Sequence, residues 1–122
     1  MTGGTGFIGS HTCLGLLENG FQIYIIDSFI NSSKESLNKI LEISKNQGTD
    51  SEGKIKLFNI DLKNKRRVEA VFQEAYSKNK QIEAVIHFAG LKSVSESISE
   101  PLKYWENNVN GTINLLKIME KF

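Results

Sequence analysis

The chain opens with a glycine-rich turn, and its spacing constrains the fold more than any other feature of the sequence. Gly3, Gly6 and Gly9 lie three residues apart in the segment Thr-Gly-Gly-Thr-Gly-Phe-Ile-Gly-Ser at positions 2–10. At this spacing the first glycine permits a tight strand-to-helix turn, the second lets backbone approach a pyrophosphate, and the third lets the helix pack closely on a sheet. The N–H groups and positive dipole end of that helix then face the anion. Glycines also serve ordinary turns, so the motif alone leaves a purely structural loop as the alternative.

The residues that follow favour a dinucleotide-binding turn over a structural loop. The next helix ends at Asn19-Gly20, a C-cap signal, and its apolar face consists of Phe7, Ile8, Leu14, Leu16 and Leu17. Residues 21–26 then predict a buried strand that ends at Asp27. An acidic residue roughly 20 positions beyond the glycines binds a ribose hydroxyl in dinucleotide-binding folds.

Strand and helix patterns alternate along the rest of the chain. We predict strands over 55–59 and 82–88, a polar loop over 46–53, and helices over 35–43, 63–80 and 100–122. In the last helix Pro101 occupies the first turn, and we expect an apolar face of Leu102, Trp105, Val109, Ile113, Leu116 and Met119. Repeated crossovers predict an α/β fold, a doubly wound parallel sheet of the Rossmann type. Met1 and Thr2 supply only the last step of a first strand, so we expect one partial domain, residues 1–122, incomplete at both ends.

Composition is that of a globular domain, and its net charge is too small to indicate binding to large anionic partners. The 122 residues are 39% hydrophobic and 24% charged, with a net charge of +1. We therefore expect no nucleic-acid or membrane partner. No apolar run approaches the roughly 18 residues of a membrane span, and no signal peptide is visible, which predicts a cytoplasmic protein. Cys13 is the only cysteine, so an intrachain disulfide is excluded.

Five segments spread along the whole chain form a selective combination. They are residues 2–12 with the glycine turn, Asp27 with Asn31-Ser32, His-Phe-Ala-Gly-Leu-Lys at 87–92, Glu96-Ser97, and Asn-Asn-Val-Asn-Gly-Thr at 107–112. Together they resemble the UDP-glucose 4-epimerase family, within the extended short-chain dehydrogenases/reductases. The glycine turn alone would match many sugar-nucleotide enzymes, whereas the later segments are far more specific. The resemblance implies an amino-terminal fragment, without the carboxyl-terminal substrate domain.

The resemblance also implies NAD as the cofactor. Asp27 suits a ribose diol and would repel a 2′-phosphate, and it is followed by Ser28 and Phe29 rather than by the arginine that favours NADP. The implied cofactor-binding residues are Gly3, Gly6, Phe7, Ile8, Gly9, Asp27, Asn31, Ser32, Asp61, Leu62, Phe88, Ala89, Gly90, Lys92 and Asn107.

Some of these residues keep a structural alternative. Asn31 and Ser32 are also turn and N-cap residues, and Asp61 could cap a helix. Lys92, whose cation suits phosphates, could instead be a solvated surface lysine. Asn107 belongs to a run of poor helix formers inside a helical pattern, which indicates either a site held by tertiary contacts or a simple irregularity; the others are Asn108, Asn110 and Gly111.

The family's catalytic groups have no match here. The resemblance implies that a Ser or Thr and a Tyr-x-x-x-Lys pair act on the sugar 4-hydroxyl, from positions beyond Phe122. Tyr76 and Lys80 do match Tyr-x-x-x-Lys, but they end a helix that leads into a strand. Ligands bind at the opposite edge of such sheets. We therefore expect no catalytic residue in this chain, and no epimerase activity from it alone.

The remaining chemistry-bearing residues predict structural roles. His87 lies inside an apolar strand and His11 on the first helix, so both are expected to be structural, and Cys13 to be a small packed residue. The histidines and the cysteine show no metal-ligand spacing, and we expect no metal site. The basic cluster of Lys63, Lys65, Arg66 and Arg67 predicts a solvated helix face.

The resemblance implies the NAD-binding half of an enzyme that interconverts UDP-glucose and UDP-galactose by transient oxidation at C4. Its partners would be a UDP-sugar and a second copy of the chain, paired through residues 100–122. Two alternatives stay open. One is a different NAD-dependent sugar-nucleotide epimerase or dehydratase, and the other is a non-catalytic nucleotide-binding module.

Overall fold

A computed structural model describes residues 1–49 and 53–122 of the chain. The chain divides into two compact units, which are described separately. Unit 1 comprises residues 1–59 and 86–88, and unit 2 comprises residues 60–85 and 89–122. The predicted loop over 46–53 is only partly visible, because positions 50–52 lie outside the described residues.

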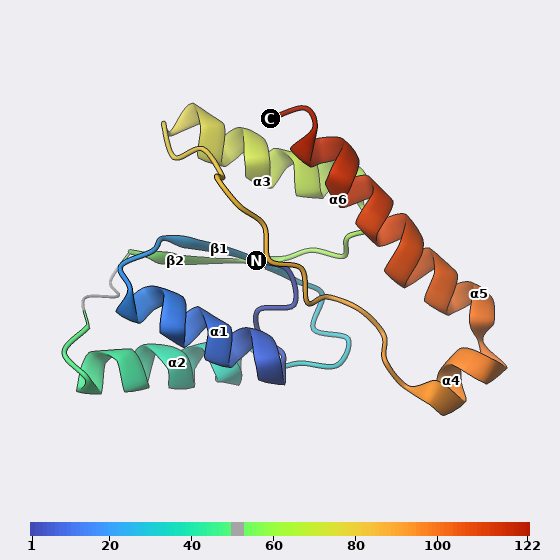
Figure 1. Cartoon of the computed structure of the whole chain (residues 1–122), viewed down its shortest axis with the longest axis horizontal. Helices are drawn as coiled ribbons and strands as arrows, with labels where there is room; N and C mark the ends of the chain where they lie inside the picture. Colours follow the sequence, from blue (N-terminus) through green and yellow to red (C-terminus); the bar gives the residue numbers. More distant parts are fainter. Residues whose placement is uncertain (50–52) are drawn as a thin grey trace. The chain divides into compact units, whose positions relative to one another are not determined.

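Unit 1 is built on a parallel pair of strands. β1 (Ile23–Asp27) pairs with β2 (Ile55–Asn59) in a register that joins Ile23 to Ile55 and Asp27 to Asn59. The helices α1 (Phe7–Glu18) and α2 (Glu35–Asn46) pack against each other on one face of these strands (Figure 1). A parallel pair requires a crossover between its strands, and α2 provides it.

The core of unit 1 explains why these segments fold as they do. Its buried centre consists of Cys13, Leu17, Ile23, Ile25 and Ile40. Cys13 and Leu17 lie four residues apart on α1, and Ile23 and Ile25 lie two apart on β1, so each pair occupies one face of its element. The apolar face predicted for α1 is only partly confirmed: Leu17 is buried and Leu14 and Leu16 are partly buried against this core, whereas Phe7 and Ile8 are exposed. α1 ends as predicted at Asn19, followed by Gly20 with φ of +82°.

The segment at 82–88 does not form the regular strand that its sequence predicts. The only ladder contact of this segment among the described residues is a single parallel bridge from Thr2 to His87. Thr2 donates its N–H to the Ile86 carbonyl and accepts from the Phe88 N–H, both at 3.0 Å. Its neighbours Met1 and Gly3 bond to Ile26 instead. Thr2 offers this segment a single bridge, so no ladder forms along it.

These bridges nevertheless define the sheet order of unit 1. Thr2 stands between β1 and His87, since it bridges both in the parallel sense. The order is therefore β2, β1, Thr2, His87, which in chain order of the four segments is 3-2-1-4. This order is that of a Rossmann-type sheet. The glycine turn follows the carboxyl end of its segment, and Asp27 is the carboxyl-terminal residue of β1. Such sheets bind ligands at this edge.

His87 makes the stability of unit 1 depend on pH. Its Nδ1 lies 2.5 Å from Thr2 Oγ1, and burial lowers the pKa of the imidazole below 6.5. The folded state therefore binds a proton less readily than the unfolded chain, so the stabilising effect is complete above pH 6.5 and is lost as the pH falls through the folded pKa. We expect urea midpoints to fall between pH 7 and 5 in the parent. His11→Gln should keep this dependence, and His87→Gln should lose it; an unchanged slope in His87→Gln would contradict the prediction.

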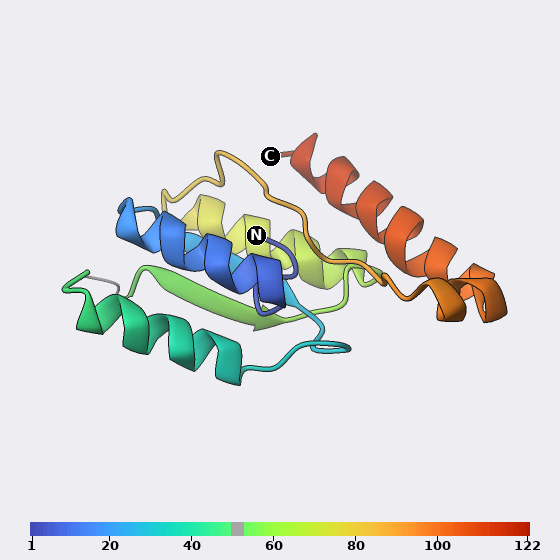
Figure 2. The ribbon, with the colours of Figure 1, turned by 60° about the horizontal axis from the view of Figure 1, so that its bottom comes forward.

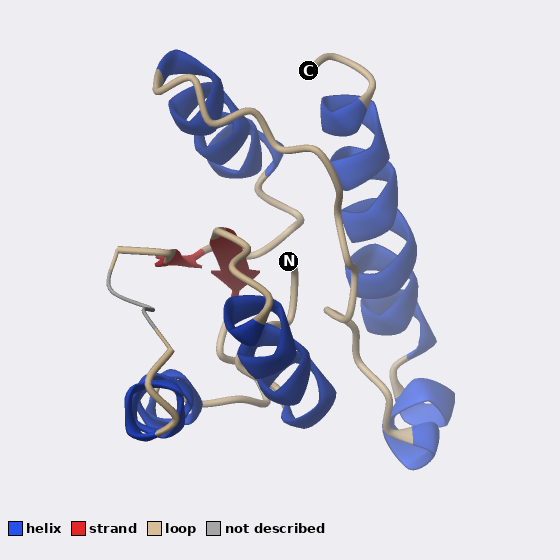
Figure 3. Ribbon diagram, turned by 60° about the vertical axis from the view of Figure 1, so that its left-hand side comes forward, coloured by secondary structure: helices blue, strands red, loops and turns tan. Residues whose placement is uncertain are grey.

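Unit 2 is helical. α3 (Lys65–Ser77) and α4 (Val94–Ser99) are followed by α5 (Pro101–Tyr104), the π-helical turn η1 (Trp105–Asn110) and α6 (Gly111–Met119). The last three elements form one continuous rod (Figure 2). The helix predicted over 100–122 is thus present, but a π turn interrupts it where Asn107, Asn108 and Asn110 gather. Figure 3 shows the chain coloured by secondary structure, with the helices in blue.

The buried face of that rod differs from the apolar face that the sequence predicts. Gly111, Leu115 and Ile118 are buried on α6, which packs against α3. An added Cβ at Gly111 would lie 3.2 Å from Leu62 Cβ, so glycine permits the close approach. Most of the predicted face is exposed instead: Leu102, Trp105, Ile113, Leu116 and Met119. The predicted face did not include Leu115 and Ile118, and a count of apolar residues passes over Gly111, although these three residues form the packed side.

No helix among the described residues is both long and apolar enough to cross a membrane.

Candidate functional site

The glycine turn has the geometry that its spacing predicts. Gly3 adopts a left-handed φ of +66°. A Cβ on Gly9 would lie 2.1 Å from the Gly3 carbonyl oxygen, so no other residue fits there. Gly6, at the N-cap of α1, makes no side-chain cap, and the first turn holds no acidic residue. Within the described residues, the positive end of α1 is therefore not compensated by an acidic residue of its own first turn.

Asp27 is the last residue of β1, and its side chain joins two loops. It is 6% exposed, and its Oδ2 accepts the Thr5 N–H at 3.1 Å. Its Oδ1 accepts the Phe29 N–H at 3.0 Å and the Ser32 hydroxyl at 2.8 Å. The Thr5 hydroxyl in turn donates to Ser32 Oγ at 2.9 Å. Charge-assisted hydrogen bonds of this kind are stronger than neutral ones, so the carboxylate ties the glycine turn to the loop after β1.

The other predicted residues of unit 1 lie near the ends of its elements. Phe7 and Ile8 are 78% and 61% exposed in the first turn of α1. Asn31 is exposed in the loop after β1, where Ser32 contacts Asp27. Phe88 is exposed just after the bridge at His87. Exposed aromatic and aliphatic side chains beside a helix start leave apolar surface to which a flat ligand can bind.

Asp61 takes the local turn role in unit 2. Its Oδ1 accepts the Lys63 N–H at 2.9 Å, and Lys63 Nζ lies 3.5 Å from the other oxygen. The cap of α3 is Asn64, whose side chain accepts the Arg67 N–H, so a capping role for Asp61 is wrong. Leu62 is buried. An Asx turn leaves the second carboxylate oxygen partly exposed.

Asn108 holds the segment that carries Lys92. Its Oδ1 accepts the Leu91 N–H at 2.8 Å, and its Nδ2 donates to the Leu91 carbonyl at 2.9 Å. Asn107 Nδ2 donates to the same Oδ1 at 3.0 Å. A Cβ on Gly90 would lie 3.4 Å from that oxygen, so Gly90 passes close to the clamp. The sequence places Asn108 in a run of poor helix formers, for which tertiary contacts were one of two interpretations, but it assigns a binding role to Asn107 and none to Asn108.

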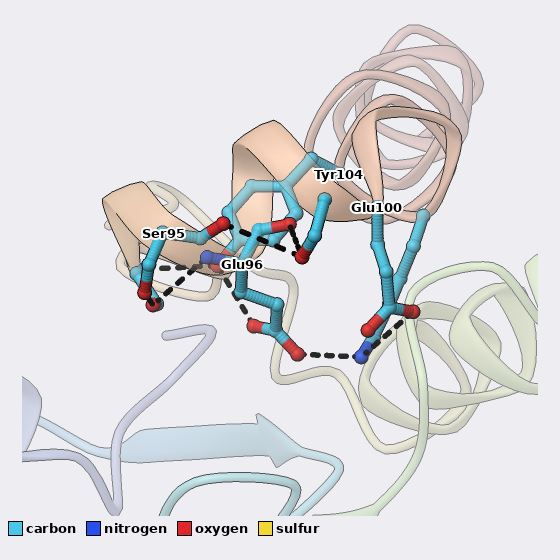
Figure 4. Close-up of polar contacts among 7 residues, drawn as sticks. Ser95, Glu96, Glu100 and Tyr104 are labelled. Atoms are coloured by element: carbon cyan, nitrogen blue, oxygen red, sulfur yellow. Dashed lines mark hydrogen bonds and ion pairs between the residues drawn. The ribbon is translucent and has the colours of Figure 1, made fainter.

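A second polar cluster lies where α4 meets α5. The Tyr104 hydroxyl donates to Glu96 Oε2 at 2.8 Å, and Lys103 Nζ donates to Glu96 Oε1 at 2.6 Å (Figure 4). Glu100 lies 3.5 Å from the same ammonium. The bonds from Lys103 and then from Tyr104 lower the pKa of Glu96, and partial burial, followed by the bond to Glu96, raises the pKa of Tyr104. The glutamate is therefore charged and the tyrosine protonated at neutral pH.

The residues predicted to be structural have structural contacts. Burial raises the pKa of the Cys13 thiol to about 11, which keeps it protonated and inert. Tyr76 lies at the end of α3, where its ring contacts Phe122 at 6.2 Å between centroids. Its position at a helix end that precedes residues 82–88 is the one that the sequence predicts.

Comparison with known proteins gives a consistent result. The family model described as GDP-mannose 4,6 dehydratase matches residues 1–122. A UDP-glucose 4-epimerase of Bacillus subtilis is 47% identical over 122 residues, which are 100% of this chain and 32% of that protein. A UDP-glucose 4-epimerase of Klebsiella pneumoniae is 41% identical over 98% of this chain and 77% of that sequence.

Solved structures of similar proteins share the fold. A UDP-glucose 4-epimerase from Bifidobacterium longum, in complex with NAD⁺ and UDP, aligns with a TM-score of 0.82 and 38% identity over 98% of this chain and 32% of that one. The chain thus spans about a third of the length of the Bacillus subtilis and Bifidobacterium longum proteins.

Proposed function

The chain belongs to the UDP-glucose 4-epimerase family, and on this premise we propose that residues 1–122 bind NAD within an enzyme that interconverts UDP-glucose and UDP-galactose. When bound, NAD would supply the reversible oxidation of the sugar at C4. The UDP-sugar is the proposed substrate. The chain's own residues bind and orient the cofactor.

The geometry of unit 1 supports NAD binding. The contact between Gly9 and Gly3 forms a turn with no room for a side chain, at the start of a helix without a side-chain cap. Pyrophosphate suits this position because backbone N–H groups and the helix dipole favour an anion. The single observation that carries the proposal is this turn together with Asp27, whose carboxylate is bonded to the turn through Thr5. A carboxylate there favours the ribose diol of NAD over a 2′-phosphate.

The other candidates are proposed for the roles that the family resemblance implies. Phe7 and Ile8 would flank the pyrophosphate turn, and Asn31 and Ser32 would contact the adenosine end. In unit 2, Lys92 would offer a cation to phosphate, and Asn107 a hydrogen bond on the cofactor side. The remaining proposed contacts are Gly3, Gly6, Gly9, Asp61, Leu62, Phe88, Ala89 and Gly90.

Calorimetric titration of the 122-residue chain with NAD and NADP tests this proposal. We expect NAD to bind and NADP to bind at least about tenfold more weakly, because the Asp27 carboxylate repels a second anionic group. Gly9→Val should abolish NAD binding, while Gly15→Ala serves as a control, since a Cβ at Gly15 meets nothing within 4 Å. Equal affinities for NAD and NADP would contradict the role of Asp27, and a parent chain that binds neither would contradict the proposed function.

A homodimer is the second part of the proposal. Leu102, Trp105 and Leu116 are 76%, 64% and 56% exposed along the rod of α5, η1 and α6. Large exposed apolar side chains on one helical rod favour association. Sedimentation of the parent and of Leu116→Glu should show a dimer that the substitution dissociates; a monomeric parent would contradict it.

A further inference from the structure

The loop that carries Lys92 is held from both sides. Leu91 is bonded through both its N–H and its carbonyl to the Asn108 side chain, and the Ser93 N–H donates to the Tyr104 hydroxyl at 2.9 Å. Lys92 itself is exposed between these two anchors. Both anchors come from the same rod, α5 with η1. The backbone of residues 91–93 is therefore fixed, while the lysine side chain reaches solvent.

The anchor at Ser93 depends on the direction of one proton. A tyrosine hydroxyl carries a single hydrogen, so Tyr104 can accept from Ser93 only if its own proton points elsewhere. The Tyr104 hydroxyl donates its hydrogen bond to Glu96 Oε2 at 2.8 Å, and Lys103 Nζ donates to the other carboxylate oxygen, Oε1. Ser93 Oγ also accepts the Glu96 N–H at 3.4 Å and caps α4. Glu96 thus sets the orientation of the hydroxyl that holds the loop.

We propose that Tyr104, oriented by Glu96, is a positioning residue that acts on NAD binding by fixing the backbone on the carboxyl side of Lys92. The inference rests on the proposed function, in which Lys92 offers its cation to phosphate. A lysine is a flexible point charge, and a fixed backbone lowers the entropy lost when its ammonium is placed on an anion.

Tyr104→Phe tests the anchor directly, because it removes only the hydroxyl. Amide hydrogen exchange of the 122-residue chain should show the Ser93 N–H exchanging about fivefold faster, the effect of losing one hydrogen bond. The Leu91 N–H, which Asn108 holds, should change less than about twofold. Tyr76→Phe is the matched control, since it removes a hydroxyl from the same unit and should leave Ser93 unchanged. An unchanged Ser93 exchange rate in Tyr104→Phe would overturn the proposal.

A double-mutant cycle with Lys92→Ala separates positioning from general stability. NAD affinity should fall about fivefold on Tyr104→Phe in the parent but less than about 1.5-fold in Lys92→Ala, because the tyrosine acts through the lysine. Equal losses in the two backgrounds would overturn the proposal even if Ser93 exchanges faster. A parent chain that does not bind NAD would contradict the proposed function, and with it the role given to Lys92. That result is distinct from an unchanged Ser93 exchange rate, which contradicts the anchor alone.

Discussion

Gly9→Ala is expected to destabilise the chain by about 3 kcal/mol, the upper part of the range for overpacking. The added Cβ would lie 2.1 Å from the Gly3 carbonyl oxygen and 2.9 Å from Gly4 Cα. Both neighbours are backbone atoms, so no side chain can rotate away, and the start of α1 must move off the turn. Urea denaturation followed by circular dichroism measures the change.

Gly15→Ala provides the control within the same helix. A Cβ at Gly15 meets nothing within 4 Å, and alanine is the better helix former, so this variant should gain about 0.5–1 kcal/mol. A Gly9→Ala variant as stable as Gly15→Ala would show that the turn relaxes without cost. The close contact would then have no bearing on the fold.

Asp27→Ala is the second substitution with a large expected effect. It removes the acceptor of the Thr5 and Phe29 N–H groups and of the Ser32 hydroxyl. The bond from Thr5 is buried, whereas those from Phe29 and Ser32 are only partly buried. A buried donor without a partner costs about 1–3 kcal/mol and a partly buried one less, so a total loss of about 3 kcal/mol is expected. NAD affinity should fall at least about tenfold, because the turn loses its link to the ribose-binding loop.

Two further variants make the measurement specific. Asp27→Asn keeps one acceptor oxygen and should lose about 1 kcal/mol of stability. Asp61→Ala also removes an aspartate that follows a strand, but that side chain is half-exposed and accepts one N–H, so a loss of about 0.5 kcal/mol is expected. If Asp61→Ala lowers the free energy of unfolding as much as Asp27→Ala does, the prediction that the bonds to Asp27 stabilise the fold more than those of an ordinary surface aspartate is wrong.

Local geometry explains which parts of the fold could be predicted. The glycine turn was predictable because a positive φ at Gly3 and a close approach at Gly9 are properties of a few adjacent residues. The same is true of the C-cap at Asn19-Gly20 and of the first two crossovers. Asp27 was predictable because its place at the end of a buried strand is a local pattern.

Long-range contacts explain what could not be predicted. Asn108 binds Leu91, which is 17 residues away, and no period in the sequence encodes that pair. The packed face of α6 was missed because Gly111 is one of its members, and a search for apolar periodicity passes over glycine. The strand predicted over 82–88 failed for a related reason, since its pattern is that of a buried strand, but the ladder depends on a partner elsewhere in the chain.

Because Cys13 is buried, its reaction with a thiol reagent can report local unfolding of unit 1. The side chain is inaccessible, and with a pKa of about 11 only about one thiol in a thousand is a thiolate at pH 8. Alkylating reagents attack the thiolate, so in the closed state the reaction should be negligible. Cys13 is the only cysteine in the sequence, so it would be labelled only in molecules in which α1 has separated from β1. The labelling rate would then measure how often this part of the core opens, without an engineered probe.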